Sequence, residues 1–259
     1  MSESAANSRN RCTSQIVIPA RLASTRLPRK LLLRETGKSL IQHTYEAALR
    51  AKRPEGVCVA ADHDEIRREV EQFGGNVKMT DPNAASGTDR VAELAERMDC
   101  DIIVNMQGDE PELAGEAVDL AVSLLEENPD AVMATLAAPI RSREQLNDPA
   151  CVKVVFDHAG RAMYFSRSPI PHPRQWDDGL LDADPAAFYQ HIGLYAYRRE
   201  FLLKLSQIPQ SSLEKIESLE QLRVIQGGHA ILVGVIEHAA VGIDTAEDYG
   251  AFVQRCAAG

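Results

Sequence analysis

The sequence lacks several features that would assign it to common protein classes. No run of about 18 apolar residues is present, which argues against a membrane-spanning helix. The net charge of −10 argues against a general nucleic-acid binder, because neutralising phosphates requires a basic surface. There is no CxxC pair, and scattered cysteines, three of them in or beside apolar runs, favour buried free thiols in a reducing cytoplasm: Cys12, Cys58, Cys100, Cys151 and Cys256. We therefore expect a cytoplasmic protein with no nucleic acid and no membrane among its partners.

Several catalytic motifs are also missing. No GxGxxG follows the first apolar run, so the phosphate fingerprint of a dinucleotide fold is absent. Residues 36–39 (TGKS) resemble the end of a P-loop, but Leu32 stands where that motif requires glycine. We interpret this segment as a turn that caps a helix. There is no GxSxG elbow and no HExxH metal site.

Alternating short apolar runs and amphipathic stretches predict an α/β fold. We expect residues 1–13 to be a disordered tail and residues 14–259 to form one domain. Strands are predicted at 15–18 (stopped by Pro19), 56–60, 76–80 and 101–106, and helices at 39–52, from Asp62 (in a capping box with Glu65) and from near Thr88. This order predicts a mostly parallel sheet flanked by helices.

The second half of the chain has a different texture. Strands are predicted at 131–138, 152–157, 161–167, 191–197 and 230–236, with a hairpin turn at 157–160 and helices at 200–205, 214–226 and 245–254. Residues 168–190 form a long loop rich in proline and aspartate, and loops of this length are often functional.

A basic loop follows the first strand. Residues 20–30 (ARLASTRLPRK) carry four cations and no acid, against the acidic background of the chain. Guanidinium and ammonium groups neutralise phosphates, and the small residues Ala23, Ser24 and Thr25 let backbone N–H groups approach phosphate oxygens. The alternative is a solvated basic loop. The position after a strand favours phosphate binding, because ligands of such sheets lie beyond the carboxyl ends of strands.

Two acidic segments could hold a metal ion. Asp109 follows the buried strand 101–106 on a glycine turn, and Mg²⁺ prefers one or two carboxylates together with phosphate oxygens. Glu110 and Glu112 fit the alternative of an acidic helix N-terminus better. Asp244 follows an apolar run and precedes a helix, so it is either an N-cap that bonds the N–H of Glu247 or a second Mg²⁺ ligand.

A further group of polar residues lies in the second half. Arg167 and His191 stand at the ends of expected strands and could bind a carboxylate or hydroxyls, although a lone histidine is more often structural. Glu214, Glu217 and Gln221 are predicted to share one helix face, which suits either polyol recognition or solvation.

Taken together, these segments resemble the 3-deoxy-manno-octulosonate (Kdo) cytidylyltransferases, also called CMP-Kdo synthetases. The matching stretches run in order from residue 18 to about 249: IPARLASTRLPRK, ASGTDR, VNMQGDEP, VKVVF, YFSRSPIP, HIGLYAYR, LEKIESLEQLR and GIDTAEDY. The resemblance implies a nucleotide-diphosphosugar transferase fold, with a Rossmann-like, mixed but mostly parallel sheet. It implies a nucleotide-binding half at about 14–130, a smaller sugar-binding and dimerisation subregion at about 131–240, and a last helix that returns to the core.

The resemblance also implies an activity and a set of site residues. The reaction would be CTP + Kdo → CMP-Kdo + diphosphate, which activates the sugar for lipopolysaccharide synthesis, in a homodimer. Arg21, Lys30, Asp109 and Asp244 would be catalytic, with Asp109 and Asp244 binding Mg²⁺. The nucleotide would contact Ala20, Arg21, Ser24, Arg26, Lys30, Ser86, Gly87, Thr88, Arg90 and Gln107. The sugar would contact Gln107, Arg167, His191, Tyr195, Glu214, Glu217 and Gln221.

Some positions depart from the family pattern. The family usually has glycine where Arg29 stands, an aromatic where Leu22 stands and proline where Ala246 stands. Two other functions stay open: a cytidylyltransferase for a related acid sugar, such as 8-amino-Kdo or a sialic acid, and a non-catalytic nucleotide-binding regulator. The missing glycine fingerprint argues against a third alternative, a dehydrogenase.

Overall fold

The structure, a computed structural model, describes residues 12–258. Most of the predicted tail, residues 1–11, lies outside the described residues. Thr13 does not belong to a tail, because its backbone N–H and its hydroxyl donate to a carboxylate oxygen of Asp101 at 2.8 and 3.1 Å. None of the helices within residues 12–258 is both long and apolar enough to cross a membrane.

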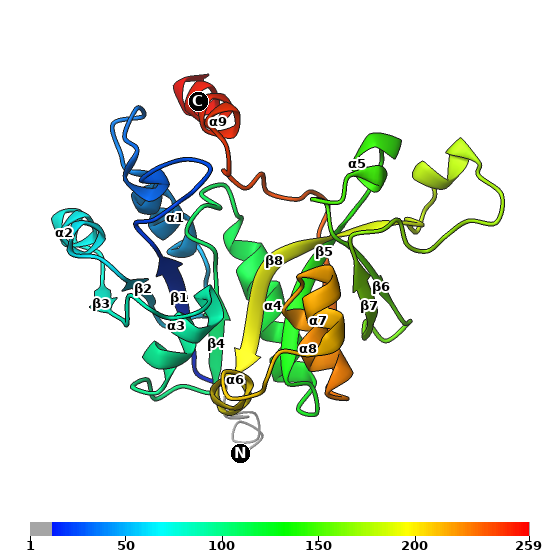
Figure 1. Ribbon diagram of the computed structural model, residues 1–259, viewed down its shortest axis with the longest axis horizontal. Coiled ribbons are helices and arrows are strands. Elements are labelled where there is room, and N and C mark those ends of the chain that lie inside the picture. Colours follow the sequence, from blue (N-terminus) through cyan, green and yellow to red (C-terminus); the bar gives the residue numbers. More distant parts are fainter. Residues whose placement is uncertain (1–11, 259) are drawn as a thin grey trace, which may run out of the picture.

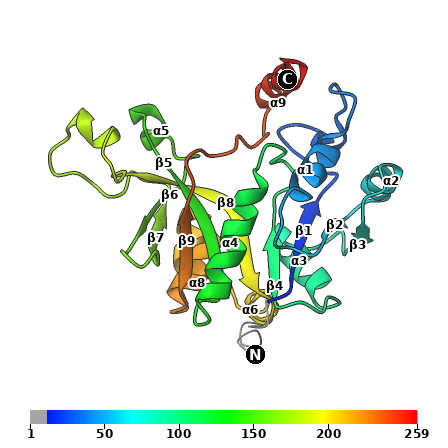
Figure 2. The same ribbon diagram turned by 180° about the vertical axis from the view of Figure 1, so that it is seen from behind.

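One mixed sheet organises the chain, in the order β3-β2-β1-β4-β8-β5-β9 (Figures 1 and 2). Four parallel strands form one side: β1 (Ser14–Ala20), β2 (Val57–Ala61), β3 (Val77–Met79) and β4 (Ile102–Asn105). The long strand β8 (Tyr189–Arg198) runs antiparallel to β4 and to β5 (Met133–Pro139), and β9 (Ile231–Val235) is parallel to β5. The prediction of a mixed, mostly parallel sheet is confirmed.

The hairpin of β6 (Lys153–Phe156) and β7 (Ala162–Ser166) extends the sheet from the start of β8, through the pair Lys153 and Gln190. The predicted turn between its strands is confirmed, because the Asp157 carboxylate accepts from two backbone N–H groups and Gly160 has a φ of 74°.

Helices cover both faces of the sheet, as Figures 1 and 2 show from opposite sides. One face packs on α1 (Leu40–Ala48), α2 (Asp64–Gln72), α4 (Gly115–Glu127) and α9 (Ala246–Ala258). The other packs on α3 (Gly87–Ala95), α6 (Arg199–Leu205), α7 (Ser212–Glu217) and α8 (Gln221–Gln226). Ile16 and Ile18 of β1 enter the first core and Val17 the second, as the two-residue period of a strand requires. The 3₁₀ turn η1 (Lys30–Leu32) adds Leu31 to the first core, whereas the short helix α5 (Arg143–Asn147) and the 3₁₀ turn η2 (Asp178–Leu181) pack in a separate small cluster.

Pro19 does not stop β1, which continues to Ala20. Along β1, every second residue turns its backbone polar groups towards β4, and Val17 and Pro19 are two of these residues. The ladder with β4 ends at the pair Val17 and Asn105. The missing N–H of Pro19 therefore interrupts no ladder bond, while pairing with β2 continues through Pro19 and Ala60.

The predicted start of the second helix is wrong. The cap of α2 is His63, whose side chain accepts from the Glu65 N–H; Asp62 instead accepts a bond from the backbone of Leu22. Of the two alternatives for Asp244, the cap of α9 does not hold. The hydroxyl of Thr245 accepts from the Asp248 N–H, and the Asp248 carboxylate accepts from the Thr245 N–H in return.

The predicted helix at 214–226 is broken in two. Ser218 has a φ of 53°, which ends α7, and α8 begins at Gln221. Glu214 and Glu217 therefore do not share a helix face with Gln221, because a left-handed residue redirects the chain. The predicted helix cap at Ser39 is confirmed, since its side chain accepts from the Gln42 N–H.

Candidate active site

A cleft of about 450 Å³ lies at the carboxyl edge of the sheet, where the basic loop and the acidic turn meet. Six of the residues predicted to bind nucleotide line it together with Asp109 and Asp244: Arg21, Ser24, Arg26, Lys30, Gly87 and Gln107. The others do not line it. Ala20 is buried at the end of β1, Ser86 caps α3, and Thr88 and Arg90 lie beneath its first turns.

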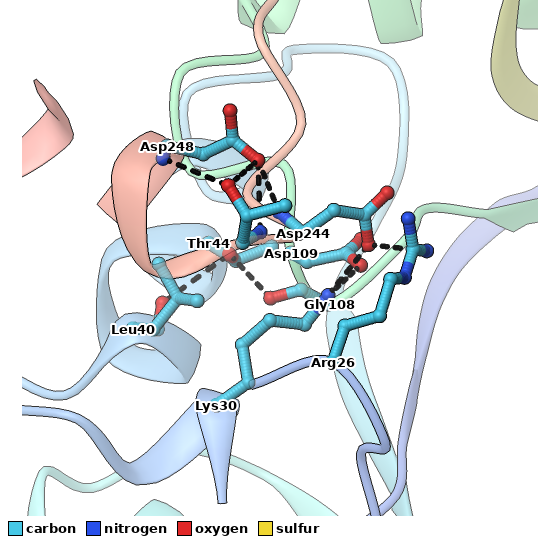
Figure 3. Close-up of polar contacts among 9 residues, drawn as sticks. Arg26, Lys30, Leu40, Thr44, Gly108, Asp109, Asp244 and Asp248 are labelled. Carbon is cyan, nitrogen blue, oxygen red and sulfur yellow. Dashed lines mark hydrogen bonds and ion pairs between the residues drawn. The ribbon is translucent and has the colours of Figure 1, made fainter. Parts of the chain in front are cut away.

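The acidic turn packs against helix α1 and strand β1. The Thr44 hydroxyl of α1 donates to the Gly108 carbonyl oxygen at 2.8 Å, as Figure 3 shows. A Cβ on Gly108 would lie 3.2 Å from the carbonyl oxygen of Pro19, so a larger residue would push the turn away from β1. The position of Asp109 is thus set by the packing of α1 and β1 below it. It does not lie at a helix N-terminus, because α4 begins at Gly115; the alternative for Glu110 and Glu112 is therefore wrong.

The segment after β9 brings Asp244 to the same point. The Ile243 N–H donates to the Asp109 carbonyl oxygen at 2.9 Å, and the fully buried Ile243 anchors this segment in the core. Asp244 then lies beside Asp109 although 135 positions separate them in the chain. The cap formed by Thr245 and Asp248 holds the backbone N–H of Asp244 at 3.1 Å from the Asp248 carboxylate.

Lys30 lies between the two carboxylates. Its Nζ donates to Asp109 Oδ2 at 2.6 Å and to Asp244 Oδ1 at 3.1 Å, and the side chain is only 11% exposed (Figure 3). Arg26 reaches the same Asp244 oxygen at 3.0 Å. Two carboxylates therefore converge on one cationic position, which is the electrostatic arrangement that a divalent cation needs.

The donor set fits Mg²⁺, since it consists of carboxylate oxygens beside a basic loop that suits phosphate. Within residues 12–258 no group of three or more histidine, cysteine, aspartate or glutamate side chains gathers to hold a metal. A metal at Asp109 and Asp244 would accordingly complete its shell with substrate oxygens and water, as Mg²⁺ does in phosphoryl-transfer sites.

Glu110 is partly buried directly beside this pair. Its Oε2 is shielded from solvent and has no hydrogen-bond partner among residues 12–258, while Oε1 lies near Gly193 of β8. Burial, followed by repulsion from Asp109 and Asp244, raises its pKa to about 8. The carboxyl is therefore mostly neutral at pH 7 in this arrangement.

Arg29 turns away from the cleft and pairs with Glu65 of α2. Its φ of 56° is in the left-handed region, where a Cβ is unfavourable, which explains the glycine that the family usually has at this position. The charge that Arg29 adds to the loop is thus directed towards α2.

Apart from Gln107, which lines the cleft, the predicted sugar residues lie on the α3 and α8 face, and most already bind protein groups. The Arg167 guanidinium donates to the carbonyl oxygens of Pro149, Glu217 and Ser218. The Glu217 carboxylate accepts from the Ser166 hydroxyl and from the Arg167 N–H.

Glu214 and His191 also contact other protein groups. Glu214 is buried and forms a two-bond ion pair with Arg223 at 2.6 and 2.8 Å. The ring of His191 packs against Phe165 and Tyr195 and contacts the Thr135 hydroxyl at 3.0 Å. Although part of the residue reaches the surface, the protein around the ring lowers its pKa to about 3 by desolvation. The sugar-binding roles of these residues stay predictions.

Tyr195 and Gln221 contact each other and leave one buried polar group that a ligand could bind. The Tyr195 hydroxyl donates to Gln221 Oε1 at 3.3 Å. Gln221 is 3% exposed, and its Nε2 has no hydrogen-bond partner in the described part of the chain. A buried amide of this kind gains from a ligand acceptor.

Two structural residues were missed by sequence reasoning. Asp62 accepts from the Leu22 N–H at 2.9 Å and lies 3.8 Å from the Arg90 guanidinium, so it holds the start of the basic loop. Glu220 accepts from the Thr88 hydroxyl. Neither had a recognisable signal, because each acts on a residue more than 35 positions away.

Comparison with known proteins identifies the family. The cytidylyltransferase family model matches residues 15–231. The 3-deoxy-manno-octulosonate cytidylyltransferase of Rhodopirellula baltica is 51% identical over 93% of this chain and 97% of its own length, and that of Syntrophotalea carbinolica is 46% identical over 90% and 94%.

Solved structures agree as well. CMP:2-keto-3-deoxy-manno-octonic acid synthetase, solved in complex with CTP, superposes with a TM-score of 0.88 at 39% identity, covering 95% of this chain and 99% of its own. The 4-diphosphocytidyl-2C-methyl-D-erythritol synthase of Anaerococcus prevotii, at 14% identity over 94% and 99% of the two chains and a TM-score of 0.61, shares the fold alone. On its sequence, its fold and its relatives, the chain belongs to the cytidylyltransferase family.

Proposed function

We propose that the protein transfers the cytidylyl group of CTP to Kdo and releases diphosphate. The observation that carries this proposal is the convergence of Lys30, Asp109 and Asp244 from three separate segments on one point of a basic cleft. The relatives that share 42–51% of their residues with this chain bear the name of that activity, and one solved relative holds CTP.

The chain's own residues support an in-line displacement. The cations of the basic loop would neutralise the triphosphate and the charge that develops on the departing diphosphate, with Arg21 exposed at the mouth of the cleft and Lys30 inside it. Ser24 and its small neighbours would offer close backbone N–H groups. Gly87 and Gln107, which line the cleft, would place the nucleoside and the acceptor.

Asp109 and Asp244 would hold Mg²⁺. The ammonium group of Lys30 would then bind phosphate oxygens in place of the two carboxylates. Bound there, the metal would supply charge neutralisation at the reacting phosphate and acidify the attacking hydroxyl. No covalent intermediate is needed. Catalysis would rest on positioning and on charge.

We propose that Kdo binds on the α3 and α8 face, where Tyr195 contacts both Gln221 and His191. The other predicted sugar residues, Arg167, Glu214 and Glu217, would have to exchange some of their present partners for the sugar. The orphaned amide of Gln221 supports this location. Activation of Kdo for lipopolysaccharide, in the cytoplasm, follows from the same proposal.

We also propose a homodimer. Met163 of β7 and Ile216 of α7 are 63% and 79% exposed, and both belong to the subregion that was predicted to dimerise. Such apolar exposure suits a partner surface. Light scattering should give twice the 28.4 kDa of the chain, and a monomer mass would contradict the dimer.

The activity is tested by diphosphate release from CTP with purified protein. We expect the highest kcat/KM with Kdo among Kdo, 8-amino-Kdo and N-acetylneuraminate, and no turnover after chelation until Mg²⁺ is returned. Faster turnover of another acid would replace Kdo as the substrate. CTP binding with no turnover of any acid would favour the regulator.

A further inference from the structure

The first turn of α3 touches the cleft on one side and the sugar-binding face on the other. Gly87 lines the cleft, and the next residue, Thr88, is 8% exposed and points to α8. The Thr88 hydroxyl donates to Glu220 Oε1 at 2.5 Å, across 132 positions of sequence.

Glu220 directly precedes α8, and the adjacent residue Gln221 accepts from the Tyr195 hydroxyl of β8. One continuous set of contacts therefore leads from Gly87 and Thr88, through Glu220 and Gln221, to Tyr195. Its first member lines the nucleotide cleft, and its last two belong to the predicted sugar pocket.

Burying the carboxyl of Glu220 costs free energy that a purely structural contact between the helices would not require. Burial raises its pKa, with the Thr88 bond acting in the opposite direction, so the surroundings disfavour its charged form. An apolar pair would pack α3 against α8 without burying a carboxyl. Helix α8 begins with no side-chain cap, so Glu220 does not act as one.

We propose that Glu220 is a positioning residue that ties the nucleotide-binding turn at Thr88 to the sugar-binding residues Gln221 and Tyr195, so that binding of either substrate strengthens binding of the other. This inference rests on the proposed function. Ordering the α3 turn around the nucleotide fixes Glu220 and with it the start of α8. By linkage, ordering α8 around the sugar fixes Thr88 to the same extent.

The test measures CTP affinity by calorimetry with Mg²⁺, alone and with saturating Kdo analogue that lacks the anomeric hydroxyl and so cannot react. We expect the analogue to tighten CTP binding by at least about fivefold in the wild type. In Glu220→Ala this ratio should fall towards one. Glu220→Gln keeps an acceptor oxygen for Thr88 and should retain most of it.

Thr88→Val removes only the hydroxyl and provides a second variant should Glu220→Ala not fold. Its effect and that of Glu220→Ala should not add in the double variant, because both break one bond. Glu200→Ala, on the exposed start of α6, is the matched control and should keep the wild-type ratio.

A wild-type ratio in Glu220→Ala or in Thr88→Val, even with lowered thermal stability, would overturn the coupling and leave a structural contact. Equal CTP affinity with and without the analogue in the wild type would overturn it as well. Failure of the proposed function looks different, because the wild type would then not turn over Kdo at all.

Discussion

The two polar regions of the molecule differ in how their charges are satisfied. Around the basic loop, Lys30 stands between Asp109 and Asp244, and the exposed Arg21 lines the cleft. On the face proposed to bind the sugar, Arg167 donates to backbone carbonyl oxygens, Glu214 pairs with Arg223, and Glu217 accepts from the Ser166 hydroxyl. The first region is arranged for a ligand that carries charge, whereas the second is stable without one. A residue's type alone does not tell these situations apart.

The largest expected effect separates the two carboxylates proposed to hold the metal from a neighbouring carboxylate. Asp109→Asn and Asp244→Asn should each lower kcat/KM by at least about 10²-fold with little loss of stability, because an amide binds a metal poorly. Glu112→Gln is the control, since Glu112 lies on the same turn but pairs with Arg255 at the surface. Near-wild-type rates in either asparagine variant would remove that residue from the metal site. Steady-state kinetics and thermal melting make the measurement.

The next prediction concerns the satisfied region. Glu214→Gln should lower the free energy of unfolding by about 2 kcal/mol, because it breaks a buried ion pair whose side chains are 6% and 10% exposed. We expect the KM for Kdo to change much less. Urea titration and steady-state kinetics distinguish the roles: unchanged stability with a raised KM for Kdo would make Glu214 a sugar ligand.

A smaller effect is expected from pH. The folded protein holds the pKa of His191 at about 3, so the unfolded chain binds a proton that the fold refuses as pH falls below the ordinary value of 6.5. Stability from this group is complete above that value and is lost on acidification. Between pH 6.5 and 5 the loss should be about 1–2 kcal/mol, and His191→Gln should remove it.

Urea unfolding at several pH values measures this slope. His158→Gln, at the exposed hairpin turn, should keep the wild-type dependence. The same slope in His191→Gln as in the wild type would show that His191 is not the group responsible.

The smallest effect tests the backbone of the basic loop. Arg29→Gly and Arg29→Ala both lose the surface ion pair with Glu65, but only glycine relieves the left-handed φ of 56°. Arg29→Gly should be more stable than Arg29→Ala by about 1 kcal/mol in thermal or urea unfolding. Equal stabilities would mean that the loop relaxes around residue 29. Activity should change little in either variant, because Arg29 points to α2.

Local patterns were sufficient for part of this structure. The apolar runs predicted nine strands with boundaries close to those observed, and the order of motifs predicted the fold. Pro19 and Asp62 were misjudged, because whether a residue ends a strand or caps a helix depends on neighbours that sequence does not place. Ser218 shows the same limit: a single left-handed residue divides a helix whose periodicity is continuous.

By itself, the sequence determined the mostly parallel sheet, the basic loop after its first strand and the acidic turn after its fourth, since these follow from runs of neighbouring residues. Only the tertiary structure decided that Asp244 meets Asp109 and Lys30, that Glu214 is bound by Arg223, and that Thr88 meets Glu220. The physical reason is distance along the chain. Hydrophobic packing of β9, α8 and α9 against the sheet creates these contacts, and no local pattern records which segments that packing brings together.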